Sequence, residues 1–213
     1  MSTPDPLPIV SLLADIAACR ICRDTPKRKP LPHEPRPVLR ASATARIAIC
    51  GQAPGTRVHA SGKPFTDPSG DRLRDWMAVD CDTFYDTARI AIVPMGFCFP
   101  GLDAKGGDIP PRPECAPEWR QQVFDHMPDL RLMLLVGSYA IKWHLGKAAK
   151  ANLTETVTAW RSYAEPHSDR SYRVFPMPHP SWRNNTWLKK NLWFADELLP
   201  ELRDSISAEL ERS

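Results

Sequence analysis

Four cysteines are spaced as a C-x2-C pair followed, much later in the chain, by a C-x16-C pair. They are Cys19, Cys22, Cys98 and Cys115, and the second pair encloses a proline-rich stretch. In a reducing compartment, clustered thiols more often hold metal than form disulfides. The pattern therefore predicts a site of four thiolates. Spacing alone leaves open whether zinc or an iron–sulfur cluster would occupy it.

Two loops carry the other groups suited to chemistry. The first, 51–65 (GQAPGTRVHASGKPF), follows an apolar run and contains three glycines and two prolines. The second, 177–185 (MPHPSWRNN), contains His179 and follows another short β-like run. Ligands bind beyond the carboxyl ends of strands in α/β folds, so both loops are predicted to contribute to a site.

The elements that must position these loops alternate between strands and helices. Strands are predicted at 45–50, 88–94, 130–137 and 172–175, and helices at 8–22, 69–79 (with Ser69 as its cap), 117–127, 138–146, 152–160 and from about Thr186 onward. Apolar strands alternating with helices indicate a mainly parallel sheet covered on both faces. The two remaining cysteines, Cys50 and Cys81, are interpreted as structural thiols.

Composition narrows the class of protein. The chain has 213 residues, is 42% hydrophobic and carries a net charge of +3, which fits one soluble globular domain spanning 1–213. We find neither a long apolar run nor a secretory signal pattern, so we expect a cytoplasmic protein without membrane attachment. The charge is compatible with an anionic partner such as nucleic acid but is too small to establish one. The 23 prolines gather in 25–37, 98–117 and 175–182, which we predict to be loops.

Taken in order, these motifs resemble the uracil-DNA glycosylase superfamily, especially its thermophile-type family four and related bacterial iron–sulfur branches. GQAPG (51–55) looks like the first active-site motif, SGKPF (61–65) like the G-x-PF element, and HPSWRNN (179–185) like the second motif. The four cysteines match the order and approximate spacing of the [4Fe-4S] ligands. The resemblance implies a three-layer α/β/α sandwich with a central, mainly parallel four-stranded sheet. It also implies a repair enzyme that excises uracil or a related deaminated base from DNA.

The resemblance assigns roles to individual residues. His179 would donate a hydrogen bond to the departing base, and Phe65 would stack on that base after its nucleotide has left the helix. The pocket would be completed by Gly51, Ala53, Pro54 and Gly55. The DNA backbone and the gap left by the flipped nucleotide would be contacted by Ser181, Arg183 and Asn184.

Two positions depart from the family pattern. The first motif normally supplies a carboxylate or an asparagine, whereas this chain has Gln52 followed by Ala53. An amide does not act as a base at neutral pH, although it can orient a water. We therefore predict Asp67 as the replacement carboxylate, with Asp71 the weaker candidate and a helix-capping role as the alternative for Asp67. In addition, 93–98 (VPMGFC) lacks the asparagine with which relatives read the uracil edge.

These departures leave alternative functions open. The first is a DNA-binding protein that recognises damaged bases with little catalysis. The second is another enzyme on the same fold, such as a different nucleic-acid hydrolase. Release of free uracil from a labelled oligonucleotide distinguishes the glycosylase from the binding protein.

Overall fold

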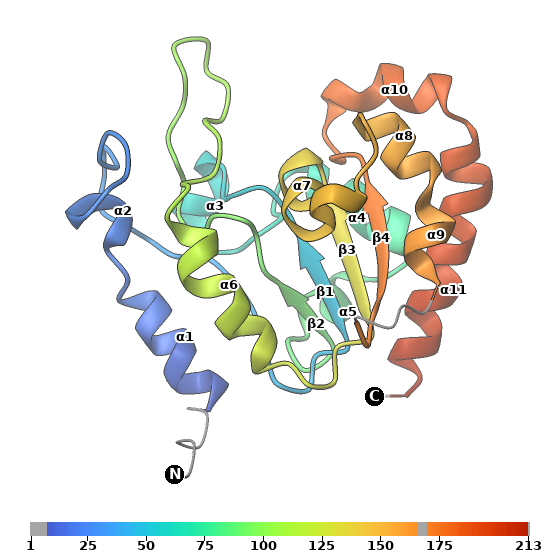
Figure 1. Ribbon diagram of the computed structural model, residues 1–213, viewed down its shortest axis with the longest axis horizontal. Helices are drawn as coiled ribbons and strands as arrows, with labels where there is room; N and C mark the ends of the chain where they lie inside the picture. Colours follow the sequence, from blue (N-terminus) through green and yellow to red (C-terminus); the bar gives the residue numbers. More distant parts are fainter. Residues whose placement is uncertain (1–7, 166–169, 213) are drawn as a thin grey trace.

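A computed structural model of the chain describes residues 8–165 and 170–212, and its centre is a parallel sheet (Figure 1). The strands are β1 (Ile47–Cys50), β2 (Ile90–Ile92), β3 (Leu132–Val136) and β4 (Arg173–Met177). The described residues form a four-stranded sheet of order β2-β1-β3-β4, in which every neighbouring pair is parallel. All four strands therefore end at the same edge, which carries both predicted loops.

Helices cover both faces of the sheet (Figure 1). They are α1 (Ile9–Ala17), α2 (Ile21–Asp24), α3 (Thr56–Ser61), α4 (Pro68–Met77), α5 (Cys81–Tyr85), α6 (Cys115–Asp125), α7 (Ser138–Leu145), α8 (Leu153–Thr158), α9 (Trp160–Ala164), α10 (Asn185–Lys190) and α11 (Leu199–Leu210), with 3-10 turns η1 (Gly146–Ala148) and η2 (Trp182–Asn184) and a π turn η3 (Phe194–Leu198). α1 packs on α6, and α4 packs on α11. The α/β/α sandwich is confirmed.

The strands are apolar because both of their faces are buried. Every residue of β1, β2 and β3 is buried, as expected for strands covered by helices on each side. β4 runs through Pro176, which we had placed in a loop, and that prediction was wrong. A proline is tolerated there because β4 is an edge strand, where its missing N–H costs no ladder bond.

Two predicted helices are broken. The helix expected over 8–22 divides into α1 and α2, because Leu12 and Ile16 enter the main core whereas Cys22 is buried in a separate cluster with Leu31 and Cys98. The terminal helix expected from Thr186 breaks at Asn191, after α10, and resumes with a π turn that leads directly into α11. Pro200 lies in the first turn of α11 and has no N–H to donate, so the chain makes wider turns before it.

A buried arginine fixes the loop after β2. Arg120 of α6 is 1% exposed, and its Nη1 donates to the carbonyls of Val93 (3.0 Å) and Pro94 (2.7 Å). Its other terminal nitrogen contacts Cys50 Sγ at 3.2 Å and the ring of His144. Arg120 thereby ties the ends of β1 and β2 to α6 and α7.

The opposite edge of the sheet is held by the last helix. Arg89, which immediately precedes β2, donates from Nη2 to the carbonyl of Leu210 at 2.8 Å. The end of α11 therefore lies beside the start of β2, away from the edge where the strands end (Figure 1). No helix in the described part of the chain is long and apolar enough to cross a membrane.

Candidate active site

The loop after β1 is pinned by its own backbone. The Gly51 carbonyl accepts from Met95 N at 2.9 Å, and the Gln52 carbonyl accepts from Gly96 N at 3.0 Å. A Cβ on Gly51 would lie 3.5 Å from Cζ of Phe65, so the Phe65 ring lies directly against this glycine. The chain then enters α3, a helix that the sequence patterns did not predict.

Phe65 is held in an unusual backbone conformation. Its φ is +55°, a left-handed value that residues other than glycine rarely adopt. Its carbonyl accepts from the Tyr85 hydroxyl at 3.1 Å and from Arg74 Nη1 at 3.2 Å. The edge of its half-buried ring meets Phe84, with the ring centroids 6.0 Å apart. The surrounding contacts thus fix both the carbonyl and the ring.

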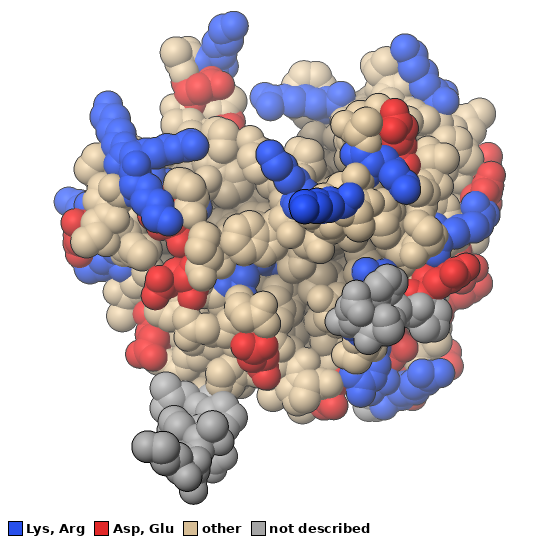
Figure 2. Space-filling view, in the orientation of Figure 1, with Lys and Arg blue, Asp and Glu red and all other residues tan. Residues whose placement is uncertain are grey.

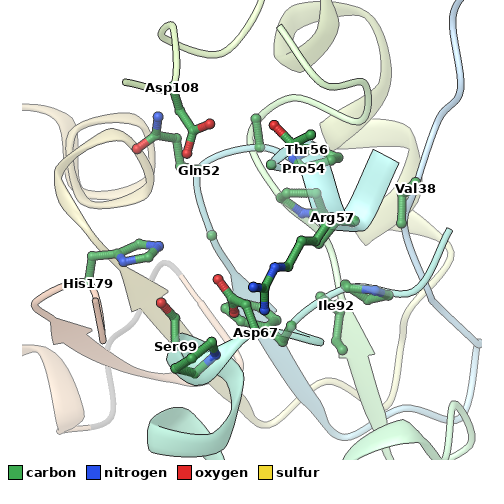
Figure 3. Close-up of a pocket in the computed structure, with 18 residues that line it drawn as sticks. Val38, Gln52, Pro54, Thr56, Arg57, Asp67, Ser69, Ile92, Asp108 and His179 are labelled. Carbon is green, nitrogen blue, oxygen red and sulfur yellow. The ribbon is translucent and has the colours of Figure 1, made fainter. Parts of the chain in front are cut away.

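A cavity of about 310 Å³ lies where these loops meet (Figure 3). Its lining includes every sequence-predicted catalytic and substrate-binding residue: Gly51, Gln52, Ala53, Pro54, Gly55, Phe65, Asp67 and His179. The fold therefore brings together segments that are more than a hundred residues apart. The predicted DNA-contacting residues Ser181, Arg183 and Asn184 are not part of this lining.

The His179 ring is directed into this cavity (Figure 3). The backbone N–H of Ser181 donates to its Nδ1 at 3.2 Å, and an acceptor Nδ1 places the proton of the neutral ring on Nε2. Burial lowers the pKa of His179, against the opposing effect of the Asp67 and Asp108 carboxylates. The ring is therefore a neutral donor at physiological pH.

Asp67 serves as the cap of α4, which corrects the assignment of that role to Ser69. The Oδ1 of Asp67 accepts from the backbone N–H of Gly70 at 3.1 Å. An aspartate satisfies a helix N-terminus well, and Pro68 after it suits the first helical position. The cap occupies only one carboxylate oxygen, and the residue still lines the cavity and acts on His179.

Asp108 is a site residue that the sequence patterns did not reveal. It lies at the base of a protruding hairpin, where it pairs with Leu102, and its oxygens are 3.8 and 3.9 Å from where a Gly55 Cβ would stand. It also lines the cavity (Figure 3). The turn-like run 103–107 (DAKGG) is a local signal of a hairpin, but it does not indicate that the hairpin packs against the loop that contains Gly55.

The comparison with known families fits this geometry. The sequence model of the uracil DNA glycosylase superfamily matches residues 37–203. The chain belongs to that superfamily. The crystal structure of wild-type Pedobacter heparinus SMUG2 is also similar: it is 13% identical, with a TM-score of 0.39, and the match covers 80% of this chain and 77% of that one. A likeness this distant adds nothing to the family assignment.

In this member of the superfamily, the segment after His179 supports the histidine and also faces solvent. Asn184 donates from Nδ2 to the His179 carbonyl at 2.7 Å, so its side chain is turned toward the histidine. Ser181 contributes its N–H to the His179 ring and its carbonyl to Arg72 Nη1 at 3.3 Å. Arg183 is exposed beside Trp182, which is itself 73% exposed. The side chains of Trp182 and Arg183 therefore face solvent.

The four cysteines of this glycosylase-family chain approach one another from three segments. Cys22 and Cys98 pack together with Leu31, and Cys115 opens α6. Burial raises the pKa of Cys22 to about 11 and of Cys98 to about 12, and neighbouring thiols add to both shifts. Burial also raises the pKa of Cys115, as do Cys22, Cys98 and Cys19. The thiols are therefore close enough to affect one another.

Two of these sulfurs accept hydrogen bonds. Phe97 N donates to Cys115 Sγ and Trp119 Nε1 donates to Cys19 Sγ, each at 3.3 Å. All the cysteines are free. Within residues 8–165 and 170–212, no group of three or more His, Cys, Asp or Glu side chains is placed to hold a metal ion. Cys50 is buried and Cys81 is exposed. The family match begins after Cys19 and Cys22, so it does not cover that pair.

Proposed function

We propose that this protein is a cytoplasmic DNA glycosylase that hydrolyses the N-glycosidic bond of uracil, or of a related deaminated base, in DNA. The observation that carries the proposal is the neutral His179, whose Nε2–H is directed into a cavity lined by Phe65 and a glycine-rich loop. A base inside a duplex is inaccessible, so its nucleotide must first rotate out of the helix into this cavity.

Bond cleavage separates charge, and side chains that line the cavity can stabilise both charges. The C1′–N bond breaks with its electron pair moving to the base, which becomes negative while the sugar becomes positive. The Nε2–H of His179 donates to a base oxygen and is worth more as the negative charge develops. The Phe65 ring replaces the stacking that the base loses, worth about 1–3 kcal/mol.

Water completes the reaction on the sugar. We assign the Gln52 amide to orient the water and the free oxygen of Asp67 to stabilise the sugar cation and accept the water proton. The water oxygen bonds to C1′, and the products are an abasic site and the free base. The support for Asp67 is its place in the cavity lining together with its electrostatic effect on His179. Asp108 adds negative charge near the mouth of the same cavity.

We also propose that Cys19, Cys22, Cys98 and Cys115 hold a [4Fe-4S] cluster. Two observations support it: the four free thiols influence one another, and two of them accept N–H bonds, which are among the features that tune such clusters. Each cysteine sulfur that holds a [4Fe-4S] cluster binds a different iron, so the four thiols need not be close enough to bind a single ion. The cluster would cross-link α1–α2, the loop after β2 and α6. Zinc is the alternative.

The test is release of free base under single-turnover conditions. The substrate is a labelled oligonucleotide carrying uracil, hypoxanthine or xanthine, and the anaerobically purified protein is in excess. Release of at least one base supports the proposal, and His179→Ala should remove it. His126→Ala, which changes a histidine on α6 away from the cavity, is the matched control and should leave release unchanged.

A second function is favoured by one observation, the amide of Gln52 at the position where the resemblance to family four implies a glutamate. In that case the protein binds damaged bases without removing them. Gln52→Glu restores the carboxylate of family four. A wild-type protein that binds uracil-containing DNA but releases nothing, combined with release by Gln52→Glu, would identify a damage sensor on a glycosylase fold.

A further inference from the structure

α7 has one buried face and one exposed aromatic face. Ala140, Ile141 and Leu145 are buried against the sheet. Tyr139, Lys142 and Trp143 occupy positions i, i+3 and i+4, so they share the opposite face. Tyr139 is 40% exposed and Trp143 is 47% exposed. Two large aromatic rings flanking a lysine are an unusual composition for a solvent-facing helix surface.

These side chains form one wall of a groove of about 390 Å³. The other wall is lined by Met95, Pro111, Arg112, Pro113 and Ala116, and the Arg112 guanidinium is engaged by Glu114 and the Lys29 carbonyl. A Cβ on Gly96 would lie only 3.2 Å from the Cβ of Pro111, so the loop after β2 packs directly on the proline-rich segment and keeps this wall in place. The groove is therefore mostly apolar and bounded by flat rings, with one ammonium group at its edge.

The groove lies near the candidate active site, although the two share no lining residue. Pro94 lines the active-site cavity, and its chain neighbour Met95 lines the groove. At the start of α7, a Cβ on Gly137 would lie 3.6 Å from the Cβ of His179. The helix that forms one wall of the groove therefore begins against His179.

Charge favours DNA as the occupant. Figure 2 shows lysine and arginine side chains standing over α7 and along the edge of the molecule where the strands end. Proteins that bind single-stranded nucleic acid combine such basic tracks with aromatic rings on which bases stack.

We propose that this groove binds an unpaired nucleotide next to the flipped one, with its base stacked on Tyr139 and Trp143 and its phosphate paired with Lys142. The proposal rests on the proposed function, because it takes the strand that enters the active-site cavity as its ligand. It adds a subsite for the flanking nucleotide, which must be unpaired for its base to reach the two rings.

Binding of short single-stranded oligonucleotides tests this inference. One oligonucleotide carries 2′-fluoro-2′-deoxyuridine, whose glycosidic bond resists hydrolysis, flanked by normal bases. In the others, the nucleotides on the 5′ or the 3′ side are abasic, so the phosphates remain while the stacking bases are removed. For the wild type, we expect one abasic flank to weaken binding by about 10-fold, the scale of one lost base–aromatic stack. The double variant Tyr139→Ala/Trp143→Ala should bind both forms with equal, reduced affinity.

The controls separate stacking from general loss. Val10→Ala, which changes an exposed apolar residue on α1, should keep the wild-type preference. Lys142→Gln should lower the salt dependence of binding by about one phosphate contact while keeping the preference for flanking bases. The nucleotide subsite would be overturned if the double variant bound DNA as tightly as the wild type, or if neither abasic flank weakened wild-type binding. Displacement of the DNA by a proline-rich peptide would also overturn it and would indicate a protein ligand. Because binding is measured without base release, a protein that shows the preference but releases nothing would contradict only the proposed function.

Discussion

The backbone N–H of Ser181 donates to Nδ1 of His179 at 3.2 Å, which leaves Nε2–H as the donor on the cavity side. The two residues are separated only by Pro180, so the histidine receives this bond from its own loop. Asn184 fixes the same loop from its other end by donating to the His179 carbonyl. The protonation state of the ring is therefore built into a short segment of chain.

The first prediction concerns pH. Because burial lowers the pKa of His179, the neutral ring prevails above its usual value of about 6.5. Single-turnover base release should therefore be independent of His179 protonation from about pH 8 to 6.5 and fall only at lower pH, as Nδ1 gains a proton and loses the Ser181 bond. The rate constant measured across this range checks it. A rate that rises as the pH falls through 7 would show that the histidine acts as a charged acid.

The second prediction compares the carboxylates. Asparagine also caps helices well, so Asp67→Asn removes charge while keeping the Gly70 bond. We expect it to slow base release by about 100-fold, and we expect Gln52→Ala and Asp108→Asn to cost less. Asp103→Asn is the matched control, since that carboxylate accepts hydrogen bonds within its own hairpin. If Gln52→Ala slows base release more than Asp67→Asn does, the Gln52 amide and not Asp67 positions the attacking water.

The third prediction concerns Gly70, the residue of α4 that packs against the Phe65 carbonyl. A Cβ at this position would lie 1.9 Å from the Phe65 carbonyl oxygen. In a free helix, Gly→Ala stabilises by about 1 kcal/mol, but here the clash with backbone should dominate and lower the free energy of unfolding. Urea denaturation should show this loss, and base release should slow because Phe65 moves. The neighbouring Ser69→Ala is the control. A more stable Gly70→Ala protein would mean that the loop at Phe65 shifts to make room for the added Cβ.

The fourth prediction concerns the cysteines. Anaerobically purified protein should be brown, absorb near ~400 nm and contain iron. Replacing Cys19, Cys22, Cys98 and Cys115 together by alanine should remove the iron and much of the soluble protein, because Cys22 and Cys98 pack in a small cluster with Leu31, separate from the main core. Cys81→Ala, at an exposed cysteine, should change neither. Stoichiometric zinc without iron in iron-replete preparations would contradict the cluster.

The fifth prediction concerns Arg183. An exposed arginine that contacts phosphate releases counterions on binding, so Arg183→Gln should weaken DNA binding more at low salt than at high salt. The slope of log K against log salt should fall by about one contact. Arg161→Gln, at an exposed arginine paired with Glu197 on another surface, serves for comparison. Equal weakening by Arg183→Gln at every salt concentration would exclude a phosphate contact.

The sequence predicted those parts of the structure that depend on local pattern. Three strands were found because they are continuous apolar runs, and β4 was found from a short β-like run that includes Arg173. The cavity was anticipated because 51–65 and His179 each follow a strand. The cap of α4 was misplaced at Ser69, although Asp67 followed by Pro68 is an equally good local signal. Where two capping residues lie two positions apart, packing of the neighbouring loop decides between them.

The remaining site could not be predicted because it depends on distant packing. Asp108 reaches the cavity through a hairpin whose position relative to Gly55 is set by the fold and not by any local spacing. Likewise, the exposed face of α7 becomes recognisable as a groove only once Pro111 is packed opposite it. Pairwise proximity of this kind leaves no periodic signal in one sequence.

The contact between Arg89 and Leu210 holds the end of α11 beside the start of β2, at the edge of the sheet opposite the candidate active site. A tether or fluorescent label joined after α11 would therefore project away from the surface that meets DNA. The protein can be immobilised by that end on a sensor chip with its cavity open to solution. Attachment through the exposed Cys81 offers an independent geometry, and equal DNA affinities from the two would show that neither obstructs binding.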